Sequence, residues 1–77
     1  MVTAPPVRRR IVGKALRRHR ERLGYTLDDT ARMLDCDRSK ASRIETGERG
    51  IRPADLEKLL AEYGIAEDQQ AILRARS

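Results

Sequence analysis

The sequence predicts an all-α fold, a compact bundle of about five short helices. Apolar residues recur at spacings of three and four, which is typical of one buried helix face. Strand signals are missing, because the sequence has no alternating run of β-branched and aromatic residues and no Asn-Gly hairpin turn. With 77 residues the chain is long enough for one small domain.

The first residues indicate a leader ahead of the domain. Residues 1–7 contain the pair Pro5-Pro6 and show no helical periodicity, so we expect them to be disordered. The domain is expected to span residues 8–77, and it opens with the basic stretch Arg8-Arg9-Arg10. This stretch is interpreted as a basic arm, with the solvated start of the first helix as the alternative.

The first helix is expected from about Arg9 to Leu23. One apolar stripe defines it, with members spaced four, three and four residues apart: Val12, Leu16, His19 and Leu23. Gly24 suits the left-handed position that ends a helix. His19 has no partner at metal-ligand spacing, so we expect it to pack inward rather than to bind a metal.

A second, shorter helix is expected after Thr26. Thr26 and Asp29 resemble a capping box, with Asp in place of the usual Glu or Gln. An apolar stripe of Leu27, Ala31 and Leu34 follows, and the tight turn Asp35-Cys36 ends the helix.

The third helix is expected over residues 37–46. Asp37 is a suitable N-cap, and Gly47 suits the left-handed C-terminal position. Ala41 and Ile44 can face a core, which leaves the polar and basic residues on the outer surface: Arg38, Ser39, Lys40, Ser42 and Arg43. Two short helices joined by so tight a turn form a helix-turn-helix. The alternative is an ordinary amphipathic helix with a solvated polar face.

These residues carry a resemblance to a known family. Thr26, Ala31, Leu34 and Cys36, followed by Arg38-Ser39-x-x-Ser42-Arg43-Ile44-Glu45-x-Gly47, resemble the XRE/Cro type of lambda-repressor-like DNA-binding domains. The flanking pattern resembles the N-terminal domain of DUF5753-type bacterial regulators. The resemblance covers roughly residues 8–75, and its most specific part lies in the third helix.

The resemblance implies a sequence-specific double-stranded DNA-binding domain of a bacterial transcription regulator. Helix 37–46 would enter the major groove. The residues expected to contact bases are Arg38, Ser39, Lys40, Ser42 and Arg43. The residues expected to contact phosphates are Arg8, Arg9, Thr26, Arg49 and Arg52. The resemblance also implies a structural ion pair between Arg20 and Glu45.

Three positions depart from the family pattern. The family often has Gln where this chain has Leu27, so one phosphate contact is expected to be lost. Asp35 stands where Gly is usual, and Asp tolerates the left-handed conformation better than most residues. Cys36 replaces a small apolar residue, so we expect a buried structural thiol rather than a reactive one.

Two further helices complete the bundle. Pro53 suits the first position of a helix that runs to Tyr63 and ends at Gly64. Its inward stripe consists of Leu56, Leu59, Leu60 and Tyr63. A last helix is expected from about Glu67 to Ser77.

Composition narrows the function classes. The formal net charge of +5 indicates an anionic partner. Two tyrosines are the whole aromatic content, which argues against base-stacking platforms. No apolar run approaches the ~20 residues of a membrane span. One cysteine cannot form an intramolecular disulfide, which fits a reducing cytoplasm. Since no catalytic or metal-ligand pattern is present, we expect no enzyme activity, no metal and no cofactor.

The resemblance implies that the partner is double-stranded DNA, bound by a homodimer at two half-sites in the bacterial cytoplasm, at the nucleoid. A C-terminal regulatory region or a protein partner would fit a larger regulator. Two alternatives stay open. The fold could serve as a protein-interaction module of the antitoxin or coactivator type, or the chain could bind DNA without sequence specificity.

Overall fold

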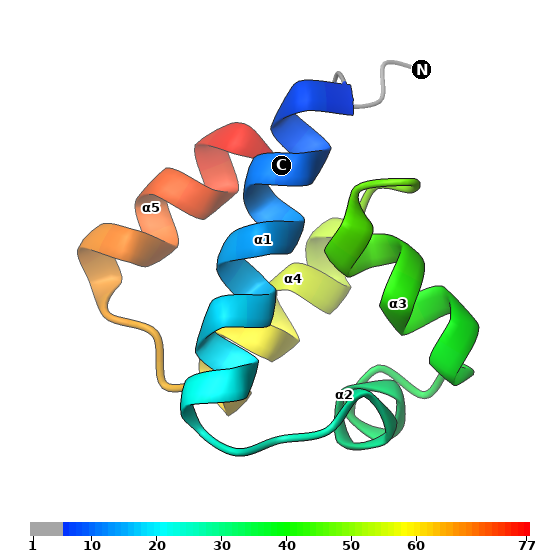
Figure 1. Ribbon diagram of the computed structural model, residues 1–77. Helices are drawn as coiled ribbons and strands as arrows, with labels where there is room; N and C mark the ends of the chain where they lie inside the picture. Colours follow the sequence, from blue (N-terminus) through cyan, green and yellow to red (C-terminus); the bar gives the residue numbers. More distant parts are fainter. Residues whose placement is uncertain (1–5) are drawn as a thin grey trace.

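The computed structural model describes residues 6–77. Within this range the protein contains helices and no strand, which confirms the predicted all-α class. The helices are α1 (Pro6–Arg22), α2 (Leu27–Met33), α3 (Arg38–Thr46), α4 (Pro53–Glu62) and α5 (Glu67–Arg76) (Figure 1).

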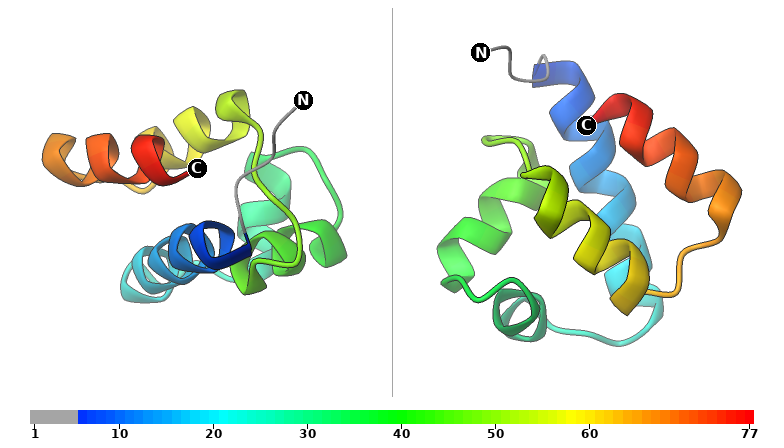
Figure 2. Two further views of the ribbon diagram at one scale, coloured as in Figure 1. Left: turned by 90° about the horizontal axis from the view of Figure 1, so that it is seen from above. Right: turned by 180° about the vertical axis from the view of Figure 1, so that it is seen from behind.

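The helices form two layers around one core. Seen from above, α4 and α5 lie in one layer, and α1, α2 and α3 lie in the other (Figure 2). α1 runs through the middle of the molecule, with α5 packed along one side and α3 along the other (Figure 1). α2 packs against both α3 and α4. This arrangement leaves the outer side of α3 without a covering helix among the described residues.

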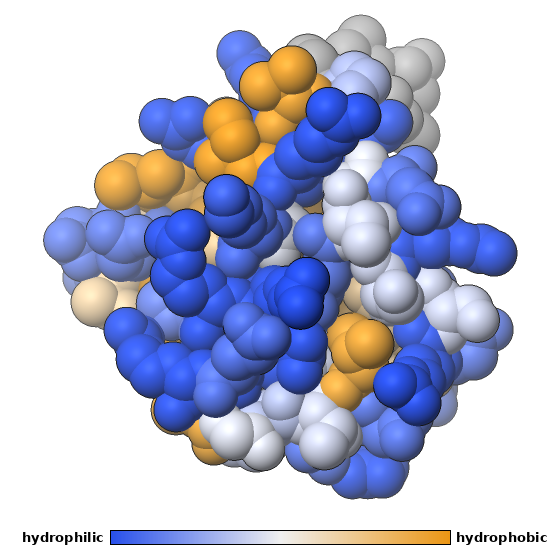
Figure 3. All heavy atoms as spheres, viewed as in Figure 1, coloured by the Kyte–Doolittle hydropathy of each residue, from blue (hydrophilic) through white to orange (hydrophobic). Residues whose placement is uncertain are grey.

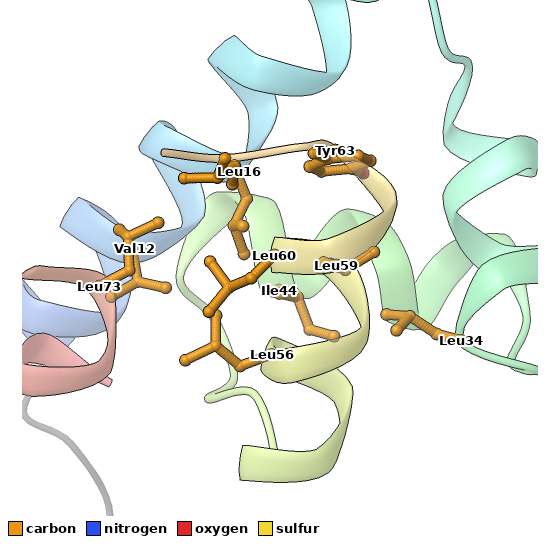
Figure 4. Close-up of a cluster of buried hydrophobic side chains, with 10 residues drawn as sticks. Val12, Leu16, Leu34, Ile44, Leu56, Leu59, Leu60, Tyr63 and Leu73 are labelled. Carbon is orange, nitrogen blue, oxygen red and sulfur yellow. The ribbon is translucent and has the colours of Figure 1, made fainter. Parts of the chain in front are cut away.

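The core is built mainly from aliphatic side chains (Figure 4). α4 contributes the largest share, because its inward stripe is buried as predicted. The ten core members are Val12, Leu16, Leu34, Ile44, Leu56, Leu59, Leu60, Tyr63, Ile65 and Leu73. Figure 4 shows Leu59 between Ile44 and Leu34, so the helix-turn-helix is anchored on α4.

The predicted caps of α2 and α3 are present. Thr26 caps α2 by accepting the backbone N–H of Asp29 at 3.1 Å, and the Asp29 carboxylate accepts the N–H of Thr26 at 2.8 Å. Asp37 caps α3 by accepting the N–H of Lys40 at 2.7 Å. Asp35 adopts a left-handed φ of 53° at the turn, and Gly47 ends α3 with a φ of 81°. The turn therefore keeps its shape without the usual glycine.

The start and end of α1 differ from the prediction. α1 begins at Pro6, so Pro6 and Val7 are helical rather than part of the leader; residues 1–5 lie outside the described range. Pro needs no N–H bond in a first turn, so the proline pair does not exclude a helix start. Arg8 and Arg9 consequently lie in α1 and not on an arm before it.

The inward stripe of α1 was predicted one turn too long. Leu23 lies beyond the last helical residue and is 47% exposed, so its predicted burial is wrong. His19 is only partly buried, and Arg22 donates to its Nδ1 at 2.8 Å. Partial burial and the adjacent Arg22 and Arg18 lower the pKa of His19. Cys36 is also only partly buried, and it packs against the edge of the core.

Tyr63, which caps the C-terminus of α4, makes one hydrogen bond to α2 and one stacking contact with Tyr25, just before α2. The hydroxyl groups of Thr30 and Tyr63 lie 2.5 Å apart in a buried hydrogen bond, and the Tyr63 ring stacks on Tyr25 at a centroid distance of 5.9 Å. Burial raises the pKa of the Tyr63 hydroxyl. A buried hydroxyl must be paired to avoid a desolvation cost, so this bond fixes how α2 sits on α4.

Candidate nucleic-acid interface

The outer face of α3 gathers most of the residues expected to contact bases. Ala41 and Ile44 are buried, and they orient the opposite side of the helix toward solvent. Arg38, Ser39 and Arg43 are exposed there, while Lys40 and Ser42 are partly buried. A shallow open hollow runs along this face, lined by Leu27, Arg38, Ser39, Ser42 and Arg43. Lys40 does not line it.

The first turn of α2 closes one end of the hollow through Leu27. Two guanidinium groups and two hydroxyls therefore share a concave surface beside a single apolar side chain. Guanidinium groups bind acceptor pairs such as guanine O6 and N7, and hydroxyls can donate or accept. These hydrogen-bond donors suit an anionic ligand that presents several hydrogen-bond acceptors.

An ion pair holds the C-terminal half of α3 on α1. Arg20 donates from Nε to Glu45 Oε2 at 2.7 Å and from Nη2 to Oε1 at 3.1 Å. Its Nη1 donates to the backbone carbonyl of Tyr25 at 2.8 Å. The side chains are only 11% and 7% exposed, so water screens the pair weakly. The hydrogen bonds to Glu45 raise the pKa of Arg20, which keeps it charged.

Two glycines bring the backbones of α1 and α3 into close contact. A Cβ atom on Gly13 would lie 2.4 Å from the carbonyl oxygens of Ile44 and Glu45. A Cβ atom on Gly47 would lie 2.8 Å from the backbone of Arg10. No side chain fits at either position, so the depth at which α3 sits against α1 depends on both glycines.

The residues expected to contact phosphates differ in their exposure and in the polar partners that they already have. Arg8 and Arg49 are exposed, and no ion pair within residues 6–77 involves either of them. Arg52 is exposed but pairs with Asp55 at 3.2 Å. The hydroxyl oxygen of Thr26 is used as the cap of α2. Of the five, Arg8 and Arg49 are the freest to bind an anion.

Arg9 differs from the other four. It is partly buried, and its Nε donates to the carbonyl oxygen of Gly47 at 3.3 Å. A Cβ atom on Gly50 would lie 3.5 Å from Arg9 Cδ, so the side chain lies against the loop that follows α3. Arg9 therefore supports the end of α3 and the next loop in addition to carrying charge.

Three features of the site were not predicted from the sequence: the close approach at Gly13, Gly47 as a packing position, and the role of Arg9 in supporting the loop. One signal was available, because a glycine inside a helix costs about 1 kcal/mol relative to alanine and often marks a close approach. The partner in that approach lies more than thirty residues away, so periodicity could not identify it. Within residues 6–77, no group of His, Cys, Asp and Glu is placed to hold a metal ion, and no helix is long and apolar enough to cross a membrane.

The fold and the exposed cationic helix define a helix-turn-helix protein. The chain matches the helix-turn-helix domain family over residues 11–73 and belongs to it. This membership agrees with the XRE-type resemblance and indicates DNA binding by a regulator. No curated protein and no solved structure matches the chain.

Proposed function

We propose that the protein is a sequence-specific double-stranded DNA-binding domain of a bacterial transcription regulator, and that α3 enters the major groove. The observation that carries the proposal is the outer face of α3, where Arg38, Ser39 and Arg43 are exposed around one hollow. A major groove about 12 Å wide admits one helix, and its base edges present the acceptors that these side chains need.

The polar residues of α3 differ in the part of the DNA that we propose they contact. Arg38, Ser39, Lys40 and Arg43 are the proposed base contacts, and Ser42 reaches either a base or a phosphate. Arginine and lysine prefer guanine O6 and N7, so each half-site should contain guanine. α2 would cross the backbone beside the groove, as the first helix of a helix-turn-helix does.

The phosphate contacts would surround this face. Arg8 in the first turn of α1 and Arg49 in the loop after α3 are the main candidates, with Arg9, Arg52 and Thr26 in support. Arg52 would have to exchange its bond to Asp55 for a phosphate, and Thr26 would have to donate its hydroxyl proton while still capping α2. These contacts position the domain without reading sequence.

A single domain of this size covers few base pairs. We propose that two copies bind half-sites about 34 Å apart, as helix-turn-helix dimers do. A C-terminal regulatory region or a protein partner would set the response of the regulator, which we place in the cytoplasm at the nucleoid.

Selection from a pool of random duplexes tests the proposal. The expected result is one enriched motif with guanine in each half-site, repeated at a spacing of one helical turn. A pool that binds but shows no enriched motif would mean that the domain binds DNA without reading it. A pool that does not bind at low salt would contradict DNA binding itself.

A further inference from the structure

The side of α1 that faces away from α3 carries an apolar patch that the proposed DNA contacts do not use. Four large hydrophobic side chains are exposed within the described residues, and three of them lie on α1 and α5: Val7 (64%), Ile11 (40%) and Ile72 (45%). We call these three residues the α1/α5 patch. Hydrophobic side chains gather over the first half of α1 and the neighbouring α5 in the space-filling view (Figure 3).

The patch lies along the contact between α1 and α5. Val12 and Leu73 meet in the core where these helices pack (Figure 4). Ile11 and Ile72 are the residues immediately before them, and both point outward. Val7 lies one turn before Ile11 on the same face of α1. The three side chains therefore border one junction.

The patch faces away from the recognition helix. Gly13 marks the side of α1 that touches α3. Ile11 precedes Gly13 by two residues, which places it roughly 160° around the helix from that side. A partner on the patch would leave the outer face of α3 free for DNA.

The charges around the patch are mostly positive. Lys14 and Arg18 continue the stripe of Val7 and Ile11 along α1. These two cations are exposed, and no ion pair within residues 6–77 involves them. α1 has no acidic residue before Glu21. The acidic residues of α5, Glu67 and Asp68, lie in its first turn.

We propose that the α1/α5 patch docks an acidic amphipathic helix of a partner protein. The apolar stripe of that helix would cover Ile11 and Ile72, and its Asp or Glu residues would face Lys14 and Arg18. Helices of this kind commonly bind by laying an apolar face on an exposed apolar surface.

A second copy of this chain fits the patch less well than an acidic helix, because a face-to-face pair would bring the two sets of α1 cations together and they would repel each other. Membrane surfaces are a poorer fit, since the patch has no aromatic anchor and the chain has no Trp or Phe. A second duplex would gain nothing from the apolar centre of the patch.

The test is titration of the isotope-labelled chain with a synthetic peptide. The probe carries leucines at helical spacing and glutamates on its other face. One control peptide has the same composition in scrambled order, and another has lysine in place of every glutamate. We expect the glutamate peptide to bind most tightly and to shift amide signals around Ile11 and Ile72.

Matched variants locate the binding surface. Ile11→Ser and Ile72→Ser should each weaken peptide binding about tenfold. Leu23→Ser should leave it unchanged, since Leu23 is similarly exposed but lies just past the far end of α1, roughly 18 Å from Ile11. All three side chains are exposed, so the variants should keep their melting temperatures and their affinity for DNA.

Several outcomes would overturn the proposal. Equal binding of the scrambled peptide would show that the peptide binds through its net charge alone. An equal loss of affinity in Leu23→Ser would show that the peptide does not bind at the α1/α5 patch. Ile11-dependent self-association in sedimentation, or Ile11-dependent binding of anionic vesicles without peptide binding, would assign the patch to another occupant. Saturating DNA should change peptide affinity less than about threefold at physiological salt, because screening limits charge effects to about 8 Å. Direct competition between DNA and peptide would contradict separate surfaces.

Discussion

At the scale of single residues, the contact between Arg20 and Glu45 is the most buried ion pair among the described residues, and it joins α3 to α1. Replacing Arg20 with Met, or Glu45 with Leu, should each cost on the order of 3 kcal/mol, because the surviving charge is left buried without its partner. The double variant should cost less than the sum of the two. Thermal unfolding of both single variants and the double variant measures this.

The exposed pair of Arg17 and Glu21 is the control for that experiment. Its side chains are 59% and 55% exposed, so its loss should cost about 0.5 kcal/mol or less. Strict additivity in the Arg20 and Glu45 cycle would contradict the proposed coupling, because it would mean that the two residues do not stabilise each other.

Arg8 and Arg9 provide a second comparison between neighbouring residues. Arg8→Ala should make the salt dependence of DNA binding shallower by up to about one log–log unit and leave the melting temperature unchanged. Arg9→Ala should also lower the free energy of unfolding by about 1 kcal/mol, since it loses the bond to the Gly47 carbonyl. Equal melting temperatures for the two variants would show that Arg9 does not support the loop.

At the scale of elements, the close contact of α1 with α3 depends on Gly13. Gly13→Ala should lower stability by about 2 kcal/mol or more, because its Cβ would lie 2.4 Å from two backbone oxygens. This loss should exceed the roughly 1 kcal/mol by which alanine favours a helix interior. Affinity for the preferred duplex should also fall, since α3 must move outward.

Gly24→Ala separates steric conflict from backbone strain. Gly24 has a φ of 77°, but a Cβ atom at this position would have nothing within 4 Å of it. Its replacement should cost about 1 kcal/mol from strain alone and should leave DNA affinity unchanged. If Gly13→Ala behaved like Gly24→Ala in both measurements, the close contact would not set the position of α3.

The helix-turn-helix could be predicted from sequence because its determinants are local. Thr26, Asp37 and Gly47 act within one turn of their own position, so capping chemistry located both helices. Leu23 was placed inward because the α1 stripe continues past the point where α1 ends. Pro6 was placed in a leader because a proline pair fits a coil and a helix start equally well.

The site was less predictable, because its arrangement depends on distant contacts. The outer face of α3 follows from the burial of Ala41 and Ile44, which the spacing indicated. The bond from Arg9 to Gly47 spans thirty-eight residues, and nothing in the local pattern distinguishes Arg9 from Arg8. Long-range contacts of this kind separate structural arginines from those free to bind phosphate.

At the scale of the whole molecule, the excess of positive charge should appear as salt dependence. If about five phosphates are neutralised, the log–log slope of affinity against salt should lie near −4 to −5. The measurement is titration of a duplex at several salt concentrations at pH 7. A slope near zero would contradict nucleic-acid binding.

The arrangement of the helices leaves the outer face of α3 uncovered among the described residues, while α1 and α2 pack against its inner face (Figures 1 and 2). A helix that reads a base sequence needs an uncovered face to contact the bases. It also needs packing on its other face to keep it in one orientation. Arg43 lies on the uncovered face, where it lines the hollow one turn beyond Ser39.

Titration of Arg43→Ala against preferred and scrambled duplexes therefore tests the central proposal most directly. Arg76→Ala is the control, since it removes the same charge from α5, which packs against α1 and α4. Arg43→Ala should lose about 1–3 kcal/mol on the preferred duplex and little on the scrambled one, with relaxed choice of base at one position. Equal losses on both duplexes would contradict sequence reading by this face of α3.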